Sequence, residues 1–376
     1  MAKQRGHGEG SIYQRSDGRW AATITLEGRK RKTFYGKTRK EVATKLNEAI
    51  QEQKQGILAT GPQQTMEQYL TRWLEEVHRP TIRESTYLNY RRFLDNHILP
   101  ALGHIYLNKL TPQLVQSFYT QKLQEGLAPG SVRDMHMVLH KALENAVRWR
   151  LVGRNPCDDV SPPQSVQHIA QPLTQKQAIR LLEAAREHRL GALLTVALAT
   201  GMRRGELLGL QWQDIDFEDR SLQIRRSMVR LGNRGVVESQ PKTSKSRRKI
   251  PLPRFVIEML KEHRTRQLEA RLRAGSAWEE NDLVFCNGFG RFFDQGQLHV
   301  EFQKFLKDAG LPPMRFHDLR HSAASFLLAM GVHPKVVQEI LGHSVIGTTM
   351  DTYSHVLPSL QREAMDKMDD LFGRNV

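Results

Sequence analysis

Residues 315–355 constrain the fold of this chain more than any other stretch, because two helical repeats follow each other there and each ends at a glycine. Apolar residues spaced three and four apart predict a first helix that Gly331 ends. A second helix is expected from Pro334 to Gly342, since proline fits a first turn and glycine follows a last one. We expect the buried faces of the two helices to consist of Phe316, Leu319, Ala323, Phe326, Leu327 and Met330, and of Val336, Val337, Ile340 and Leu341.

Four polar side chains of this stretch have spacings that a packed core does not require. His317 and Arg320 lie three residues apart on the flank of the first helix, which we expect to face a cleft. His343 directly follows the second helix, and Tyr353 comes ten residues later. Each feature alone also has a structural interpretation, as a surface or core pair, a helix cap or a packed tyrosine. Together they indicate a chemical site.

A zinc site is the main alternative for the same helix. His317 and His321 are four residues apart, which is the spacing of the two histidines in the H-E-x-x-H zinc motif. The second position of the motif is Asp318 here, so the general-base glutamate is absent, and Arg320 would repel a cation. The sequence therefore predicts neither a metal nor another cofactor.

The chain is strongly basic, with a formal net charge of +16 over 376 residues and a pI near 10.0. This charge implies a polyanionic partner, with nucleic acid as the first candidate and an anionic membrane surface as the second. The longest apolar run, from Leu190 to Ala199, is too short to span a membrane, and the polar N-terminus does not resemble a signal peptide. Cys157 and Cys286 supply no disulfide framework. We therefore expect a cytoplasmic protein.

Residues 1–57 are expected to form a small N-terminal domain. Strands are predicted at residues 11–15, 20–26 and 31–35, and a helix with one apolar face should then cover the sheet. A basic three-stranded sheet can enter the major groove of DNA, although a solvated basic module would have the same composition. The candidate DNA contacts of this domain are Arg19, Arg29, Lys30, Arg31 and Lys32.

The next part of the chain, residues 63–155, has the periodicity of an all-helical domain. Its helical segments are punctuated by prolines and glycines, among them Pro100 and Gly126. A linker rich in proline is expected at residues 156–171. The four predicted helices span residues 66–78, 83–97, 111–125 and 129–149.

The third domain is expected to span residues 172–376. Helices are predicted at residues 178–188 and 190–200, and the second is apolar nearly all round, which predicts burial. The sequence TGMRRGELLGL follows and places Arg203 and Glu206 three apart at the start of a new helix. An arginine beside a buried helix is costly unless it serves a ligand or a fixed partner.

A basic hairpin is predicted after this helix. Strand candidates lie at residues 221–229, 236–238 and 248–252, and the chain between residues 225 and 249 has nine Lys and Arg against one acid. We expect this hairpin to carry Lys242 toward a polyanion. Further DNA contacts of the hairpin are expected from Lys245, Arg247 and Arg248, and the chain then continues through a helix at residues 254–274, a strand at 283–286 and a helix at 295–309.

These residues resemble the tyrosine recombinase, or phage integrase, family over nearly the whole chain. The family's catalytic domain has an Arg in a TGxRxxE context, a Lys on a β-hairpin, a His-x-x-Arg, a later His or Trp, and a nucleophilic Tyr. The matching residues are Arg203 with Glu206, Lys242, His317 with Arg320, His343 and Tyr353.

The resemblance implies a multidomain, mainly α protein with small β elements. Residues 63–155 look like the family's helical core-site DNA-binding domain. Residues 1–57, with a three-stranded sheet plus a helix, are similar to the arm-type DNA-binding domain of temperate-phage and conjugative-transposon integrases. The third domain resembles the α+β catalytic domain, with a helix in its C-terminal tail.

The implied function is that of a site-specific recombinase, an integrase and excisionase of a mobile element that works through a 3′-phosphotyrosine. Attack on a phosphodiester builds negative charge on the nonbridging oxygens, which suits Arg203 and Arg320. The resemblance makes Tyr353 the nucleophile and implies that His317 helps to accept its proton. It also implies that Lys242 protonates the leaving 5′ oxygen and that His343 hydrogen-bonds the transition state, while Glu206 is expected to orient Arg203.

The partners implied are double-stranded DNA, at core-type and arm-type sites, and further copies of the chain. From Pro358 the tail has one apolar face, which in the family docks on a neighbouring protomer to give a tetramer; packing on its own domain is the alternative. A host DNA-bending protein, an excision factor and a location at the nucleoid are also implied, with no membrane partner. The alternatives are a relaxing enzyme like a type IB topoisomerase and a non-catalytic DNA-binding regulator.

Overall fold

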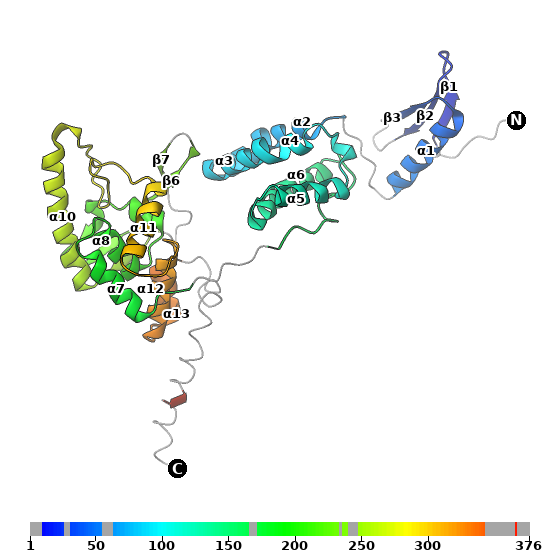
Figure 1. Ribbon diagram of the computed structural model, residues 1–376. Helices are drawn as coiled ribbons and strands as arrows, with labels where there is room; N and C mark the ends of the chain where they lie inside the picture. The colour runs from blue at the N-terminus through cyan, green and yellow to red at the C-terminus, as the bar shows by residue number, and fades with distance from the viewer. Residues whose placement is uncertain are drawn as a thin grey trace, which may run out of the picture. The chain divides into compact units, whose positions relative to one another are not determined.

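Separate hydrophobic clusters organise the chain, and each belongs to one part of the sequence. The computed structural model describes residues 10–25, 31–54, 63–164, 171–232, 235–239, 247–342 and 365–366 (Figure 1). Two compact units comprise residues 1–167 and 168–376. The first unit contains one cluster in its N-terminal sheet and another among its helices, and the second contains a large cluster and a small one. None of the helices in the described ranges is long and apolar enough to cross a membrane.

The N-terminal residues form an antiparallel sheet in the order β1-β2-β3, and a helix covers one of its faces. The predicted covering of the sheet by a helix with one apolar face is confirmed, because Ala22 and Ile24 pack against Val42 and Leu46 of the helix. The elements are β1 Ser11–Gln14, β2 Trp20–Thr25, β3 Arg31–Gly36 and α1 Arg39–Lys54.

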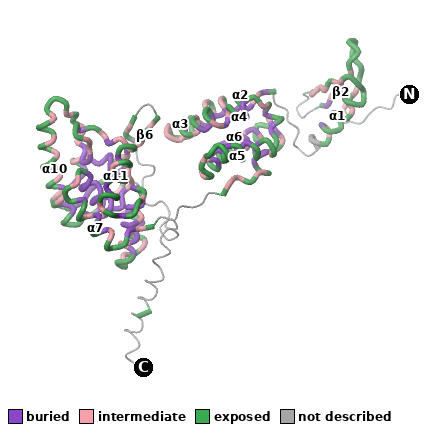
Figure 2. The backbone as a smooth tube through the Cα atoms, viewed as in Figure 1, coloured by how far each residue is buried: buried purple, intermediate pink, exposed green. Residues whose placement is uncertain are grey.

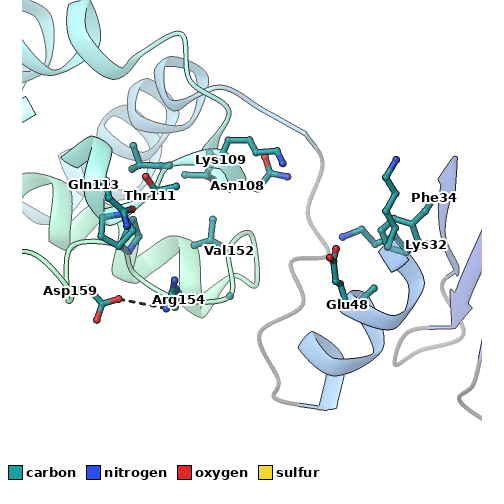
Figure 3. A pocket seen from close by; sticks show the side chains of 17 residues that line it. Lys32, Phe34, Glu48, Asn108, Lys109, Thr111, Gln113, Val152, Arg154 and Asp159 are labelled. Carbon is teal, nitrogen blue, oxygen red and sulfur yellow. Dashed lines mark ion pairs between the residues drawn. The ribbon is translucent and has the colours of Figure 1, made fainter. Parts of the chain in front are cut away.

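The basic side chains of this sheet do not share one face. Lys32 pairs in register with Ile24, whose side chain faces α1, and the Lys32 ammonium lies 5.7 Å from the centre of the Phe34 ring (Figure 3). Arg31, the residue before Lys32 on the strand, therefore points to the opposite face, because successive side chains of a strand alternate. Arg19 forms an exposed ion pair with Asp17 at 2.9 Å.

The helices of residues 63–164 enclose a core that includes Tyr69, Trp73 and Tyr119, all of them fully buried. The prediction that the helix stops before Pro100 was wrong. The helical path continues because this proline lies in the first turn of a new helix, where no backbone N–H is needed. The elements are α2 Met66–Arg72, η2 Trp73–His78, η3 Arg79–Thr81, α3 Glu84–Phe93, η4 Leu94–Ile98, α4 Leu99–Leu102, η5 Leu107–Lys109, α5 Pro112–Gln124 and α6 Pro129–Arg148. Beyond α6, Arg154 pairs with Asp159 at 3.7 Å (Figure 3).

The second unit is built around α8, whose buried residues lie on every side of the helix, as its composition predicts. It packs against α7, α10 and α12. Figure 2 shows the buried segments gathered inside this unit, whereas α10 is exposed along much of its length. The helices are α7 Gln175–Ala185, α8 Gly191–Thr200, α9 Arg204–Leu208, η6 Trp212–Asp214, α10 Arg254–Ala274, η9 Gly275–Ala277, α11 Gln295–Asp308, α12 Asp318–Ala329 and α13 Pro334–Leu341.

Two small antiparallel sheets replace the strands predicted between residues 221 and 252. The predicted strand at residues 221–229 is split, because Arg226 turns inward to a buried carboxylate of Asp214 at 2.6 Å. The predicted strand at 283–286 is wrong too, since Leu283 forms only an isolated bridge with Gln211. The sheets are β4-β5-β8, with β4 Ile215–Asp216, β5 Ser221–Gln223 and β8 Lys249–Pro251, and β6-β7, with β6 Ser227–Arg230 and β7 Val236–Ser239.

In the helix pair of residues 318–341, the burial of two residues near the turn between the helices differs from the prediction. Met330 and Val336, both predicted to be buried, are 69% and 45% exposed. The reason is that α12 and α13 contact each other through a small cluster of Ala324, Leu328, Val337 and Leu341, which turns Met330 and Val336 outward.

Candidate active site

The junction of α8 and α9 positions Arg203 and Glu206. Gly201 ends α8 in the left-handed conformation, with φ of 62°, and Arg203 is the cap residue of α9. The Glu206 carboxylate accepts hydrogen bonds from the Arg203 backbone N–H at 3.0 Å and from Arg203 Nη1 at 2.9 Å. The predicted pairing of these two residues is thus a local property of the helix start.

Glu206 is shared between two arginines. Its side chain is buried, and Arg248 Nη2 donates to its Oε2 at 3.1 Å, the oxygen that also accepts the Arg203 backbone N–H. Burial acts to raise the pKa of Glu206, but the charges and hydrogen bonds of Arg248 and Arg203 outweigh that effect and lower the pKa below its usual value. The carboxylate therefore stays ionised at neutral pH.

Arg320 lies at the ends of two other helices. Its Nη1 donates to the carbonyl of Gly201 at 2.8 Å, after α8, and to the carbonyl of Leu341 at 2.7 Å, at the end of α13. The residue is only 3% exposed, so it does not face an open cleft as its position on the helix flank suggested. The reason is that unsatisfied carbonyls at a helix C-terminus attract a cation.

Arg203 reaches the same end of α13. Its Nη2 donates to the carbonyl of Gly342 at 2.8 Å, next to the Leu341 carbonyl that Arg320 holds. Gly342 is the left-handed residue that ends α13, with φ of 68°. Two arginines that are far apart in the sequence therefore bind consecutive carbonyls.

His317 is the residue before α12, and its ring lies 5.3 Å from that of His321 in an edge-to-face arrangement. Although His317 as a whole is exposed, loss of hydration at its ring, with the neighbouring His321 and Arg320, lowers its pKa to about 4. His317 is therefore neutral at pH 7 and can accept a proton. Among the described residues, no group of three His, Cys, Asp or Glu side chains could hold a metal ion.

The structure brings Arg203, Glu206 and Arg320 of the predicted site together at the end of α13, and it places His317 directly before the helix that carries Arg320. Arg31 and Arg247 are exposed. Arg248 is not on the surface where the sequence placed it, because its side chain is 8% exposed and paired with Glu206. The predicted residues Arg29, Lys30, Lys242, Lys245, His343 and Tyr353 lie outside the described residues, as does the tail helix apart from Met365 and Asp366.

The role of Arg248 was missed in the sequence, although a signal for its burial was present. Ile250 is buried two residues further along the same strand region. Since alternate residues of an extended chain point to the same side, Arg248 had to share the inward side with Ile250. Its place in a basic run, between Arg247 and Lys249, favoured the surface prediction instead.

Known families match both units of the chain. The model of the phage integrase family matches residues 171–359, and that of the phage integrase N-terminal SAM-like domain matches residues 65–123. A XerC-like tyrosine recombinase of Caldanaerobacter subterraneus is 33% identical over 360 residues, which is 91% of this chain and 92% of the relative. The ICEBs1 integrase of Bacillus subtilis is 30% identical over 292 residues, covering 76% of this chain and 77% of the relative.

Solved structures with the same fold are integrases in complex with DNA. The Tn1549 transposon integrase with a circular intermediate DNA has a TM-score of 0.69 at 21% identity, over 81% of this chain and 99% of that one. The lambda integrase tetramer on a Holliday junction has a TM-score of 0.57 at 20% identity, over 89% of this chain and 95% of that one. These likenesses extend the shared fold across both units.

Proposed function

The chain belongs to the phage integrase family of tyrosine recombinases, and we propose that it cleaves and rejoins DNA at specific sites through a 3′-phosphotyrosine intermediate. The observation that supports the proposal is that Arg320 and Arg203 donate hydrogen bonds to the consecutive carbonyls of Leu341 and Gly342. A cluster of guanidinium groups at one place is what a phosphodiester needs when negative charge builds on its nonbridging oxygens.

Each residue of the site has a distinct task in this proposal. Arg203, whose side chain is 39% exposed, meets the scissile phosphate, and Arg320 adds its charge from the buried side. His317, neutral at pH 7, accepts the proton of the attacking phenol of Tyr353. Lys242 protonates the leaving 5′ oxygen, and His343 hydrogen-bonds the transition state.

The step conserves bond energy. The phenol oxygen of Tyr353 forms a bond to phosphorus, the bond from phosphorus to the 5′ oxygen breaks, and that oxygen leaves as a hydroxyl. A 5′-hydroxyl of a second duplex can attack the phosphotyrosine and reverse the reaction in a recombinant strand. Neither ATP nor a metal ion is needed for this exchange.

The test is the formation of a covalent adduct between the protein and DNA in EDTA. We expect the wild type to form the adduct on DNA from the flanks of its element, and Tyr353→Phe to form none. Arg203→Met should slow adduct formation by at least about 100-fold, by analogy with the removal of an oxyanion-hole donor. An adduct on folded Tyr353→Phe would refute the assignment of the nucleophile. Site-independent relaxation of any supercoiled plasmid would favour a topoisomerase.

We further propose that the substrate is the integration and excision site of a mobile element, bound at the nucleoid by three domains. Residues 1–57 would bind arm-type sites, residues 63–155 core-type sites and residues 172–376 the scissile phosphate. The tail would dock on a neighbouring protomer to give a tetramer, with a host DNA-bending protein and an excision factor as further partners.

Footprinting tests whether different domains bind the arm-type and the core-type sites. The full chain is expected to protect core and distal sites, and a chain without residues 1–57 only the core. Loss of both footprints would contradict the assignment of arm-type binding to the N-terminal domain. A truncation before Ser359 that still forms synaptic complexes would exclude docking by the tail.

A further inference from the structure

Arg248 has no task in the proposed chemistry, yet it occupies the centre of the site. Its Nε donates to the carbonyl of Ile340 at 2.6 Å, near the end of α13. Its Nη2 and Nη1 donate to the two carboxylate oxygens of Glu206 at 3.1 and 3.3 Å. One rigid guanidinium thus joins the end of α13 to the carboxylate that orients Arg203.

We propose that Arg248 is a positioning residue for DNA cleavage: it holds Glu206, and through Glu206 the guanidinium of Arg203, in register with the C-terminal end of α13. This proposal rests on the assignment of Arg203 as a phosphate ligand. A fork of donors in one plane suits the task, because a lysine at the same place could reach only one of the two partners at a time.

Burial is the first argument that Arg248 acts within the protein and not on DNA. The side chain is 8% exposed and that of Glu206 is 3% exposed, so water screens their attraction weakly. Burial lowers the pKa of Arg248, while the charge of Glu206 opposes that effect. Without Arg248, the buried carboxylate would be left with the more exposed Arg203 as its cationic partner, and that guanidinium would be drawn toward Glu206 and away from the phosphate.

The backbone around Arg248 provides the second argument. Gly342 accepts a hydrogen bond from Arg203, and a Cβ on this glycine would lie 2.7 Å from Nη1 and 2.9 Å from Cζ of Arg248. The glycine therefore leaves room for the guanidinium as well as ending the helix. Along the chain, Arg248 lies six residues after Lys242, and Gly342 directly precedes His343.

The chain contains a matched control for a buried arginine. Arg226 Nη1 donates to the buried carboxylate of Asp214 at 2.6 Å and to the carbonyl of Gly209 at 3.3 Å. This is the same combination of one carboxylate and one carbonyl, and its side chain is also largely buried. Among the described residues, Arg226 bonds or pairs with Gly209, Asp214 and Glu238, and none of these is assigned to the chemistry. Arg226→Met therefore reports the structural cost of losing such an arginine.

The experiment measures single-turnover cleavage of a nicked suicide substrate by the full chain at saturating DNA, together with DNA affinity and thermal unfolding. We expect Arg248→Met to slow cleavage about 10- to 100-fold, the usual cost of removing a partner that orients a reactive group, with DNA affinity unchanged within about threefold. Arg248→Lys should recover part of the rate. Arg226→Met should lose stability and cleave at the wild-type rate per folded molecule.

A double-mutant cycle tests the route through the carboxylate. Glu206→Gln should itself slow cleavage, and adding Arg248→Met to it should slow cleavage by less than about threefold more, because the two residues act as one unit. The proposal would be overturned if the double variant were slowed by the product of the factors for Glu206→Gln and Arg248→Met alone. Wild-type cleavage by Arg248→Met would overturn it too, as would a loss of DNA affinity with an unchanged saturated rate, which would make Arg248 a DNA contact.

Two outcomes distinguish a failure of the positioning role of Arg248 from a failure of the assignment of Arg203 as a phosphate ligand. If Arg203→Met cleaves at the wild-type rate, the proposed site is wrong, whatever Arg248 does. If Arg248→Met does not fold, Arg248→Lys decides: a slow rate with a normal unfolding temperature supports the positioning role, and a wild-type rate refutes it.

Discussion

Replacement of Gly342 by alanine should show how tightly the site is built around the end of α13. Gly342 and Gly331 both follow a helix in the left-handed conformation, with φ of 68° and 77°. A Cβ at Gly342 would lie 2.7 Å from Arg248 Nη1, whereas a Cβ at Gly331 would meet nothing within 4 Å. The two substitutions therefore share backbone strain and differ in their collision with Arg248.

The difference can be estimated from the contacts. An alanine in the left-handed conformation costs about 1–2 kcal/mol, and this applies to Gly331→Ala and Gly342→Ala alike. Gly342→Ala must also displace the Arg248 guanidinium from Glu206 and from the carbonyl of Ile340. Breaking a buried ion pair costs about 3–5 kcal/mol, and we expect about 3 kcal/mol because Arg248 is moved and not removed. Gly342→Ala should thus lose about 4–5 kcal/mol of the free energy of unfolding.

The measurement is urea unfolding of the full chain, followed by cleavage of the suicide substrate under conditions where each variant is folded. Gly331→Ala should cleave like the wild type, and Gly342→Ala should cleave as slowly as Arg248→Met. In an Arg248→Met background the extra cost of Gly342→Ala should disappear, so that only the strain of an alanine in the left-handed conformation remains. Equal losses of stability for the two glycine variants would refute the reasoning.

Two further predictions concern His317 and the N-terminal sheet. Because the pKa of His317 falls from 6.5 to about 4 on folding, its contribution to stability is complete above pH 6.5 and is lost as the pH falls toward 4. Ring titration by NMR should show this histidine neutral at pH 5.5, and a midpoint near 6.5 would contradict the burial argument. Arg31→Ala should weaken binding to arm-type DNA more than Lys32→Ala, since Lys32 lies on the face that α1 covers. Equal effects in a gel-shift assay would oppose that assignment.

The sequence predicted much of the secondary structure because hydrophobic periodicity is local. Burial of α8 all round and the pairing of Arg203 with Glu206 depend on residues within a turn or two of each other. The split at residues 221–229 could not be seen in this way, because it arises when Arg226 turns toward Asp214, twelve residues back. The burial of Arg248 depends on Glu206, 42 residues away, and on the end of α13.

The placement of the arginines at helix ends explains how the site can hold several cations together before DNA arrives. Arg203 and Arg320 donate to carbonyls at the C-terminal ends of α8 and α13, which carry only partial negative charge. Within the described residues, these two arginines and Arg248 bring three guanidinium charges against the one carboxylate of Glu206, which is an excess of positive charge. Glu206→Gln would increase that excess while loosening the geometry. If charge alone set the rate, Glu206→Gln would cleave faster; the shared carboxylate instead requires it to cleave more slowly, because a misaligned guanidinium loses more transition-state stabilisation than added charge returns.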